Sequence, residues 1–213
     1  ATGVQMADIA TQVILGHSLR EQGITEVYGR EKQRWFVKAP AFSFSKIRGV
    51  ESYLSPEMKS TGEAIGYDDK LTRALYKASG MKVANYGTVL LTIADKDKEE
   101  VLPLARRFYN LGFNIEATSG TADFLRRHGL RTRLRRKLCE GSSEIIDSLR
   151  QGHVSYIINT IDLDQHNTRF DGYEIRRTAV ENNVTLFTSL ETVKVLLDVL
   201  EEITFGVSTI DAK

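Results

Sequence analysis

The sequence contains little cysteine and almost no net charge. Its 213 residues include one cysteine, Cys139, which excludes a disulfide within the chain and fits a reducing cytoplasm. The formal net charge is +1, so no overall field draws the protein to nucleic acid or to an acidic membrane. No apolar run approaches the roughly 18 residues of a membrane-spanning helix, and the first residues lack a signal-peptide pattern. We therefore expect a cytoplasmic protein without nucleic-acid or membrane partners.

Metal-binding and catalytic motifs are missing as well. The four histidines and Cys139 do not have the spacing of a metal site, so we expect no bound metal. There is no nucleophile elbow, no P-loop and no HExxH segment, so we expect no catalytic residues. The composition, 41% hydrophobic and 27% charged, is typical of a globular protein.

The first 82 residues predict few regular elements. Apolar spacing over 4–16 is typical of a helix that ends at Gly16, and 33–47 has an extended, aromatic-rich character with Pro40 at an end or edge of a strand. Residues 55–79 are expected to form a loop that leads into a helix capped near Asp68. These elements are too few to close a core. Because the chain also begins at Ala1 without a methionine, we expect the end of a domain in a fragment of a longer protein.

From Gly87 onward the pattern alternates between strand and helix. Continuous apolar runs predict parallel strands that are buried on both faces, and amphipathic segments between them predict crossover helices. The expected fold is therefore an α/β parallel sheet between two helical layers. Strands are expected at 88–94, 113–118, 154–160 and 184–189, and helices at 96–112, 121–129, 144–152, 173–183 and 190–203.

Groups suited to binding an anion follow three of these strands. Lys98 comes after the first strand, Thr118 and Thr121 flank Ser119 and Gly120 after the second, and Asn159 and Thr160 end the third. The carboxyl ends of parallel strands meet at one sheet edge, where helix N-termini offer free N–H groups to anions. A further lysine, Lys137, precedes a Glu-Gly pair. Together these residues indicate an anion or nucleotide site.

Each residue also has an ordinary structural interpretation. Thr118 and Thr121 alone are more often helix caps than ligands, Lys98 lies in a charged stretch typical of a solvated helix start, and Asn159 can simply brace a turn. Asp162 and Asp164 form a pair of a kind that is common in solvated loops.

A basic stretch runs from Arg126 to Lys137 and holds six arginines and one lysine. Such a run is consistent with a nucleic-acid patch, but it lacks the interleaved aromatic residues on which bases stack. A solvated face and an interface with an acidic neighbour are equally consistent with it.

Several motifs resemble the carbamoyl-phosphate synthase large subunit. The segment "FSFSKIRGVESYLSPEMKSTGEAIG" (42–66) resembles the tail of its second ATP-grasp unit, and "PEMKSTGE" is specific to that enzyme. The segment "VLLTIADKDKEEVLPLARRFYNLGFNIEATSGTADFLRRHGL" (89–130) resembles the regulatory domain that follows, and "YIINT" and "YEIRRTAVENNV" continue the match. "ATGVQMADIATQVILG" resembles the helix-bearing stretch upstream, so the resemblance covers essentially the whole chain.

The resemblance implies an organisation and a parent reaction. Residues 1–82 would be the C-terminal part of the second ATP-grasp domain, and 83–213 a methylglyoxal-synthase-like allosteric domain. The parent makes carbamoyl phosphate from bicarbonate, glutamine-derived ammonia and ATP, with Mg²⁺ or Mn²⁺, for pyrimidine and arginine biosynthesis. Its partner is a glutaminase small subunit. Most ATP-binding residues and the metal ligands would lie upstream of Ala1, so this fragment is not expected to turn over ATP or to hold a cofactor.

The resemblance also implies a nucleotide effector. UMP inhibits many bacterial members, and IMP can bind in their regulatory domain. The phosphate ligands of those members fall here on Lys98, Thr118, Thr121 and Lys137. Positions that support the phosphate or contact the base or ribose fall on Thr92, Asn159 and Thr160.

The sequence departs from the motifs of related proteins at several positions, and these departures argue against some functions. Ala39 stands where ornithine-activated relatives carry a carboxylate, which argues against ornithine activation. The alternative function is a methylglyoxal-synthase-type lyase that acts on a triose phosphate, but its "GGDQQ"-type segment is absent and "KLCEGSSEI" does not match it. The "KTLHP" segment of the purine cyclohydrolase domain is also absent.

Overall fold

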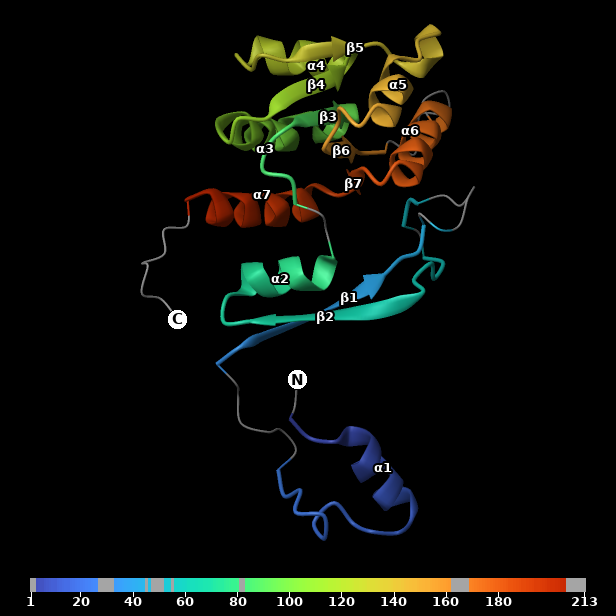
Figure 1. The fold of residues 1–213 in the computed structure, drawn as a ribbon, viewed down its shortest axis with the longest axis vertical. Coiled ribbons are helices and arrows are strands. Elements are labelled where there is room, and N and C mark those ends of the chain that lie inside the picture. Colours follow the sequence, from blue (N-terminus) through green and yellow to red (C-terminus); the bar gives the residue numbers. More distant parts are fainter. Residues whose placement is uncertain are drawn as a thin grey trace.

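The computed structural model describes residues 3–26, 33–44, 46, 52–54, 56–80, 83–161 and 169–205. Helix α1 (Met6–Ile14) lies near the N-terminus and apart from the other elements (Figure 1). It ends, as expected, just before Gly16, whose φ of +99° suits a residue without Cβ. No residue of α1 is buried, and Met6, Val13 and Ile14 are exposed.

The next elements form a small unit of two strands and one helix. Strand β1 (Trp35–Ala41) pairs antiparallel with β2 (Gly62–Asp68), and α2 (Leu71–Ser79) packs on them (Figure 1). Of the apolar side chains described before residue 83, only those of Ala74 and Ala78 are buried. The unit therefore has almost no core, as its sequence suggests.

Two expectations for this unit were wrong. The segment expected as a loop before the helix contains β2, which packs under α2. Gly66 allows this close approach, because a Cβ there would collide with the backbone of Ala74 and Ala78. The N-cap of α2 is Lys70 and makes no side-chain capping bond. Asp68 lies two residues earlier and accepts a hydrogen bond from the Lys70 N–H (3.2 Å).

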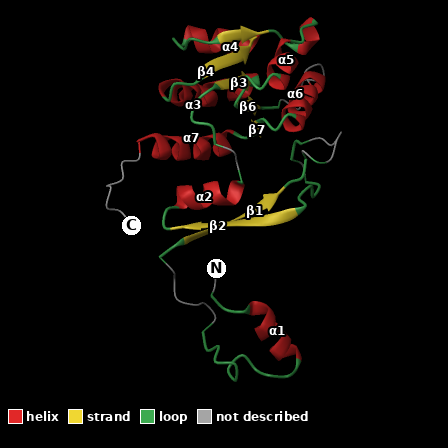
Figure 2. Ribbon diagram, in the orientation of Figure 1, coloured by secondary structure: helices red, strands yellow, loops and turns green. Residues whose placement is uncertain are grey.

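The second half of the chain contains a parallel sheet of five strands (Figure 2). The strand order is β5-β4-β3-β6-β7, so the chain moves from β3 toward one edge and then returns to the other side of β3. All pairings in this sheet are parallel. The strands are β3 (Thr88–Thr92), β4 (Asn114–Thr118), β5 (Arg133–Arg135), β6 (Tyr156–Asn159) and β7 (Thr185–Phe187).

Helices cover both faces of this sheet, as expected for an α/β fold. Helices α3 (Lys98–Asn110), α4 (Ser119–Arg127) and α7 (Leu190–Phe205) pack on one face with Val89 and Leu91. Helices α5 (Glu144–Arg150) and α6 (Arg169–Glu181) pack on the other with Leu90 and Ile157. Because successive β3 side chains point to opposite faces, the continuous apolar run is buried on both sides.

A cluster of aromatic side chains around Tyr156 connects the sheet to the segment at Ala84, just before β3. Tyr156 is fully buried among Phe108, Phe113 and Phe187. Its hydroxyl accepts a hydrogen bond from the Ala84 N–H (2.7 Å) and donates one to the Ala84 carbonyl (3.0 Å). Burial raises the pKa of this phenol, so it remains a donor at neutral pH.

The two units meet through α2 and α7, which pack against each other (Figure 1). The expected boundary near residue 82 lies outside the described residues. Within the described ranges, none of the helices combines the length and apolarity needed to cross a bilayer.

Candidate functional site

Hydrogen bonds tie the strand ends of the parallel sheet together. The Thr121 hydroxyl of α4 accepts from the Ile93 N–H (3.3 Å) and donates to the Ile93 carbonyl (3.4 Å) just beyond β3. The Thr160 hydroxyl, after β6, accepts from the Ala94 N–H (2.8 Å). The expected gathering of residues after β3, β4 and β6 on one edge is thus present. It lies where the strand order switches direction around β3, the usual place for ligands in such sheets.

Lys98 lies over the first turn of α4. A Cβ added at Gly120 would come within 3.3 Å of the Lys98 ammonium nitrogen, so the glycine leaves room for this close approach. The side chain of Lys98 is only 17% exposed, and its ammonium pairs with Asp95 at 2.6 Å. A cation thus lies beside unpaired N–H groups at a helix N-terminus, an arrangement that attracts an anion.

Lys137 contributes to the same electrostatic environment. The pKa of Asp95 is lowered first by its hydrogen bond from Lys98, then by the charge of Lys98, and also by the charge of Lys137. Lys137 precedes a 3₁₀ turn (Leu138–Glu140), in which its N–H donates to Glu140 (3.3 Å) and Gly141 closes the turn at φ +75°. The charges of both lysines assigned to the phosphate therefore act on the Asp95 carboxylate.

The two threonines do not cap α4 with their side chains. Thr118 occupies the N-cap position, but it makes no side-chain capping bond. Thr121 directs its hydroxyl to Ile93 instead, because that buried strand end lies within reach. Both residues are nearly fully buried. The capping interpretation is therefore wrong for these hydroxyls, although the first turn of α4 retains its unpaired N–H groups.

Asn159 is buried on the β6 side of the site. Its side-chain nitrogen faces the Thr92 hydroxyl at 3.5 Å, and its oxygen accepts a hydrogen bond from Arg176 of α6 (2.8 Å). Arg176, only 5% exposed, was not among the expected site residues. The helical periodicity of α6 could have identified Arg176 as an inward-facing residue, because it lies on the same side of the helix as Ile175 and Ala179, which face the core.

Cys139 and Asp171 connect the Lys137 turn to α6. The Cys139 N–H donates to Asp171 (2.9 Å). The pKa of the Cys139 thiol is raised above that of an ordinary cysteine, first by its hydrogen bond to Asp171 and then by desolvation. The thiol is thus a weak nucleophile at neutral pH. No group of three or more His, Cys, Asp or Glu side chains in the described part of the chain is placed to hold a metal ion.

A family comparison matches part of this half of the chain. Residues 100–188 match the family model of the MGS-like domain. The parallel sheet with helices on both faces is an α/β fold that matches such a domain. Among solved structures, methylglyoxal synthase from Elizabethkingia anophelis NUHP1 is 13% identical, with a TM-score of 0.46 over 61% of this chain and 97% of that one. ForH is 16% identical, with a TM-score of 0.42 over 57% of this chain and 81% of that one.

The basic stretch 126–137 is divided among several elements. Arg126 donates to the Thr132 carbonyl (3.0 Å), and Arg135 forms a paired contact with the buried carboxylate of Glu116 (2.6 and 2.8 Å). The stretch also contains the short edge strand β5, which the sequence did not predict because it is mostly charged. It is therefore not one continuous solvated face.

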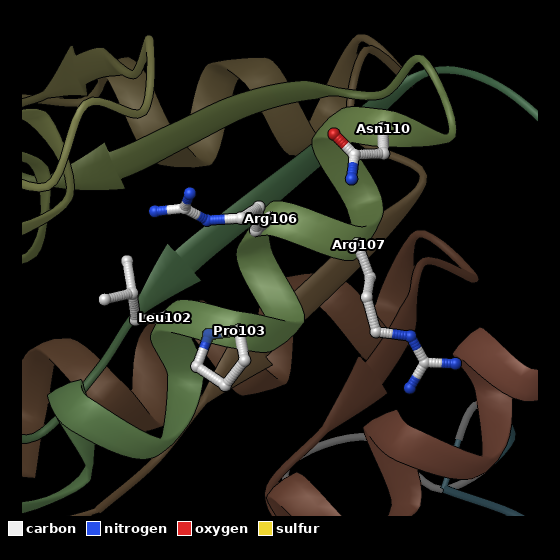
Figure 3. Close-up of a pocket in the computed structure, with 5 residues that line it drawn as sticks. All are labelled: Leu102, Pro103, Arg106, Arg107 and Asn110. Carbon is white, nitrogen blue, oxygen red and sulfur yellow. The ribbon is translucent and has the colours of Figure 1, made fainter.

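Two hollows occur among the described residues, and one of them shares Thr160 with the strand-end site. One, of about 230 Å³, is lined by residues that include Tyr53, Lys96, Thr160 and Glu191. The other, of about 260 Å³, lies on α3, where Arg106 and Arg107 extend in different directions (Figure 3). Arg107 there bonds Glu201 and Asp198 of α7. Asp162 and Asp164 lie outside the described residues.

Proposed function

We propose that the MGS-like domain binds a phosphorylated effector, a nucleotide such as UMP or IMP. The observation that carries this proposal is the position of Lys98 over Gly120 at the N-terminus of α4, with Lys137 acting on the same Asp95. Lysines neutralise a phosphate dianion, and hydroxyl and backbone N–H groups orient it. Thr118 would supply a hydroxyl and Thr121 a backbone N–H, because the Thr121 hydroxyl already bonds Ile93. Thr92, Asn159 and Thr160 would face the rest of the ligand.

The proposed context is the C-terminal part of a carbamoyl-phosphate synthase large subunit. The "PEMKSTGE" segment and the order of the two units support it. In this context the domain is regulatory and has no catalytic residues, and ATP with Mg²⁺ or Mn²⁺ belongs to the rest of the large subunit. Effector binding would bias the packing of the two units, with a coupling of about 1–3 kcal/mol. The remaining large subunit and the glutaminase small subunit would be its partners.

Two measurements on one preparation test this function. Isothermal calorimetry with UMP, IMP and inorganic phosphate should show binding, with nucleotides tighter than phosphate alone. An assay with dihydroxyacetone phosphate should show no release of phosphate. Turnover of that triose phosphate would instead support a lyase of the methylglyoxal-synthase type, and absence of binding to all three ligands would contradict the effector site.

A further inference from the structure

A buried arginine fixes the orientation of the amide in the site. Arg176 Nη1 lies 2.8 Å from Asn159 Oδ1, and both residues are at least 95% buried. A guanidinium carries only donors, so the amide atom that faces it must be the oxygen. The geometry of this pair therefore fixes the orientation of the Asn159 amide, with Oδ1 toward Arg176 and Nδ2 on the other side.

The consequence is a hydrogen-bond donor directed at the strand-end site. With the oxygen held by Arg176, the Asn159 NH₂ group faces Thr92, whose hydroxyl lies 3.5 Å away. This contact is long for a hydrogen bond, and an NH₂ group has two protons to donate. The amide thus retains donor capacity on the side where a ligand would lie.

Gly172 provides the space that the arginine needs. An added Cβ at Gly172 would lie 2.8 Å from Arg176 Nη1 and 3.8 Å from Asn159 Oδ1. Gly172 lies inside α6, where glycine is unfavourable for the helix by roughly 1 kcal/mol relative to alanine in ordinary contexts. Its position beside the Arg176–Asn159 pair gives this glycine a specific steric role.

The topology places this donor beyond the phosphate. Lys98, Thr118 and Thr121 follow β3 and β4, whereas Asn159 ends β6 on the other side of β3. A ligand whose phosphate lies at the α4 N-terminus extends toward Asn159 with its remaining atoms.

We infer that Arg176 is a positioning residue that sets ligand specificity by holding Asn159 as a donor. The site then favours a phosphorylated ligand that carries a hydrogen-bond acceptor, a carbonyl or hydroxyl oxygen, at that distance from its phosphate. This inference rests on the proposed effector function and assigns Arg176 and Gly172 to it.

The test compares UMP with inorganic phosphate by calorimetry. Arg176→Met removes the donor and should weaken UMP binding about fivefold to tenfold, as loss of an oriented hydrogen bond does, with less than about twofold change for phosphate. Arg176→Lys should restore part of the UMP affinity. Arg177→Met is the matched control, because Arg177 lies on the outer side of α6 and pairs with Glu181 (3.0 Å). It should bind both ligands as the wild type does.

Gly172→Ala separates specificity from folding. The added methyl displaces the guanidinium without removing a charge, and the helix preference of alanine offsets part of the cost of breaking the buried pair. The variant, shown to be folded by its melting transition, should bind UMP more weakly and phosphate as the wild type does. If Arg176→Met does not fold, Gly172→Ala tests the positioning role of Arg176. Equal losses for UMP and phosphate, or unchanged UMP binding, in the folded variants would overturn the inference. Failure of the wild type to bind either ligand would instead contradict the effector site itself.

Discussion

The Asp95 carboxylate pairs with Lys98, the lysine that we assign to the phosphate. Its lowered pKa keeps it ionised well below neutral pH, so it competes with any anion for Lys98. Asp95→Asn should therefore strengthen phosphate binding about two- to fivefold, the range of an exposed ion pair.

The measurement is calorimetry with inorganic phosphate at constant ionic strength. Asp123→Asn on the exposed side of α4 is the control for a general charge effect. Weaker binding by Asp95→Asn would mean that the carboxylate supports the site rather than competing in it.

The reactivity of the Cys139 thiol tests the geometry of the turn that contains Lys137. Because Asp171 and desolvation raise the thiol pKa above that of an ordinary cysteine, alkylation by iodoacetamide should be slow at pH 8, with its midpoint at a higher pH than for a cysteine in an unstructured peptide. Asp171→Asn removes the carboxylate and should lower that midpoint. Mass spectrometry of the modified chain at pH 7–10 measures the profile, and a wild-type midpoint no higher than that of the peptide would contradict the contact.

At this scale the sequence identifies some site residues and misses others. Lys98, Thr121 and Thr160 were predicted to lie together because strand ends of a parallel sheet meet, and the structure brings them together. Asp95 and Arg176 were missed, since a charged residue in a loop or helix does not show from its spacing which partner it will meet. Binding at these residues stays a prediction.

At the scale of elements, β6 anchors the segment before the sheet through Tyr156. Tyr156→Phe removes the hydroxyl that bonds both the N–H and the carbonyl of Ala84. The protein should lose about 1–2 kcal/mol of unfolding free energy, because these backbone groups are left without that partner. Urea denaturation followed by circular dichroism measures the loss.

Tyr86→Phe is a matched control, because the Tyr86 side chain is 82% exposed. It should change the unfolding free energy by less than about 0.5 kcal/mol. Equal stability of the two variants would show that the Tyr156–Ala84 contact contributes nothing.

The sequence predicts the elements whose apolar pattern matches their burial. Helix α3 was expected from an amphipathic pattern, and it buries its apolar residues Val101, Leu104, Ala105 and Phe108. Strand β2 was missed because "GEAIGYD" is rich in glycine, alanine and acid, residues with little strand preference that are favoured there by close packing under α2. Strand β5 was missed because Arg135 is neutralised by Glu116 on the neighbouring strand, which no local pattern reveals.

For the whole molecule, Glu202 links the two units. It pairs with Lys70 and Arg73 of α2 (both 2.9 Å), and its pKa is lowered first by the Lys70 hydrogen bond. The stabilising effect of this carboxylate is thus present above its ordinary pKa and is lost as the pH falls through the lowered value. The pair is partly exposed, so the effect is modest.

Limited proteolysis with chymotrypsin tests this linkage. We expect cleavage within residues 1–82 before the parallel-sheet unit, because the first part exposes many large apolar side chains. Glu202→Gln should accelerate this cleavage about twofold at pH 7, whereas Glu181→Gln should not. Earlier cleavage of the parallel-sheet unit would contradict the stability difference.

The central claim is that Lys98 holds the phosphate of an effector. Calorimetric titration of UMP into wild type, Lys98→Ala and Lys96→Ala tests it most directly, because the two lysines lie two residues apart and both changes remove one positive charge. Lys98→Ala should weaken UMP binding about tenfold to hundredfold, the range for hydrogen bonds to charged groups, and Lys96→Ala should bind nearly as the wild type does. Equal affinities for wild type and Lys98→Ala would contradict the account.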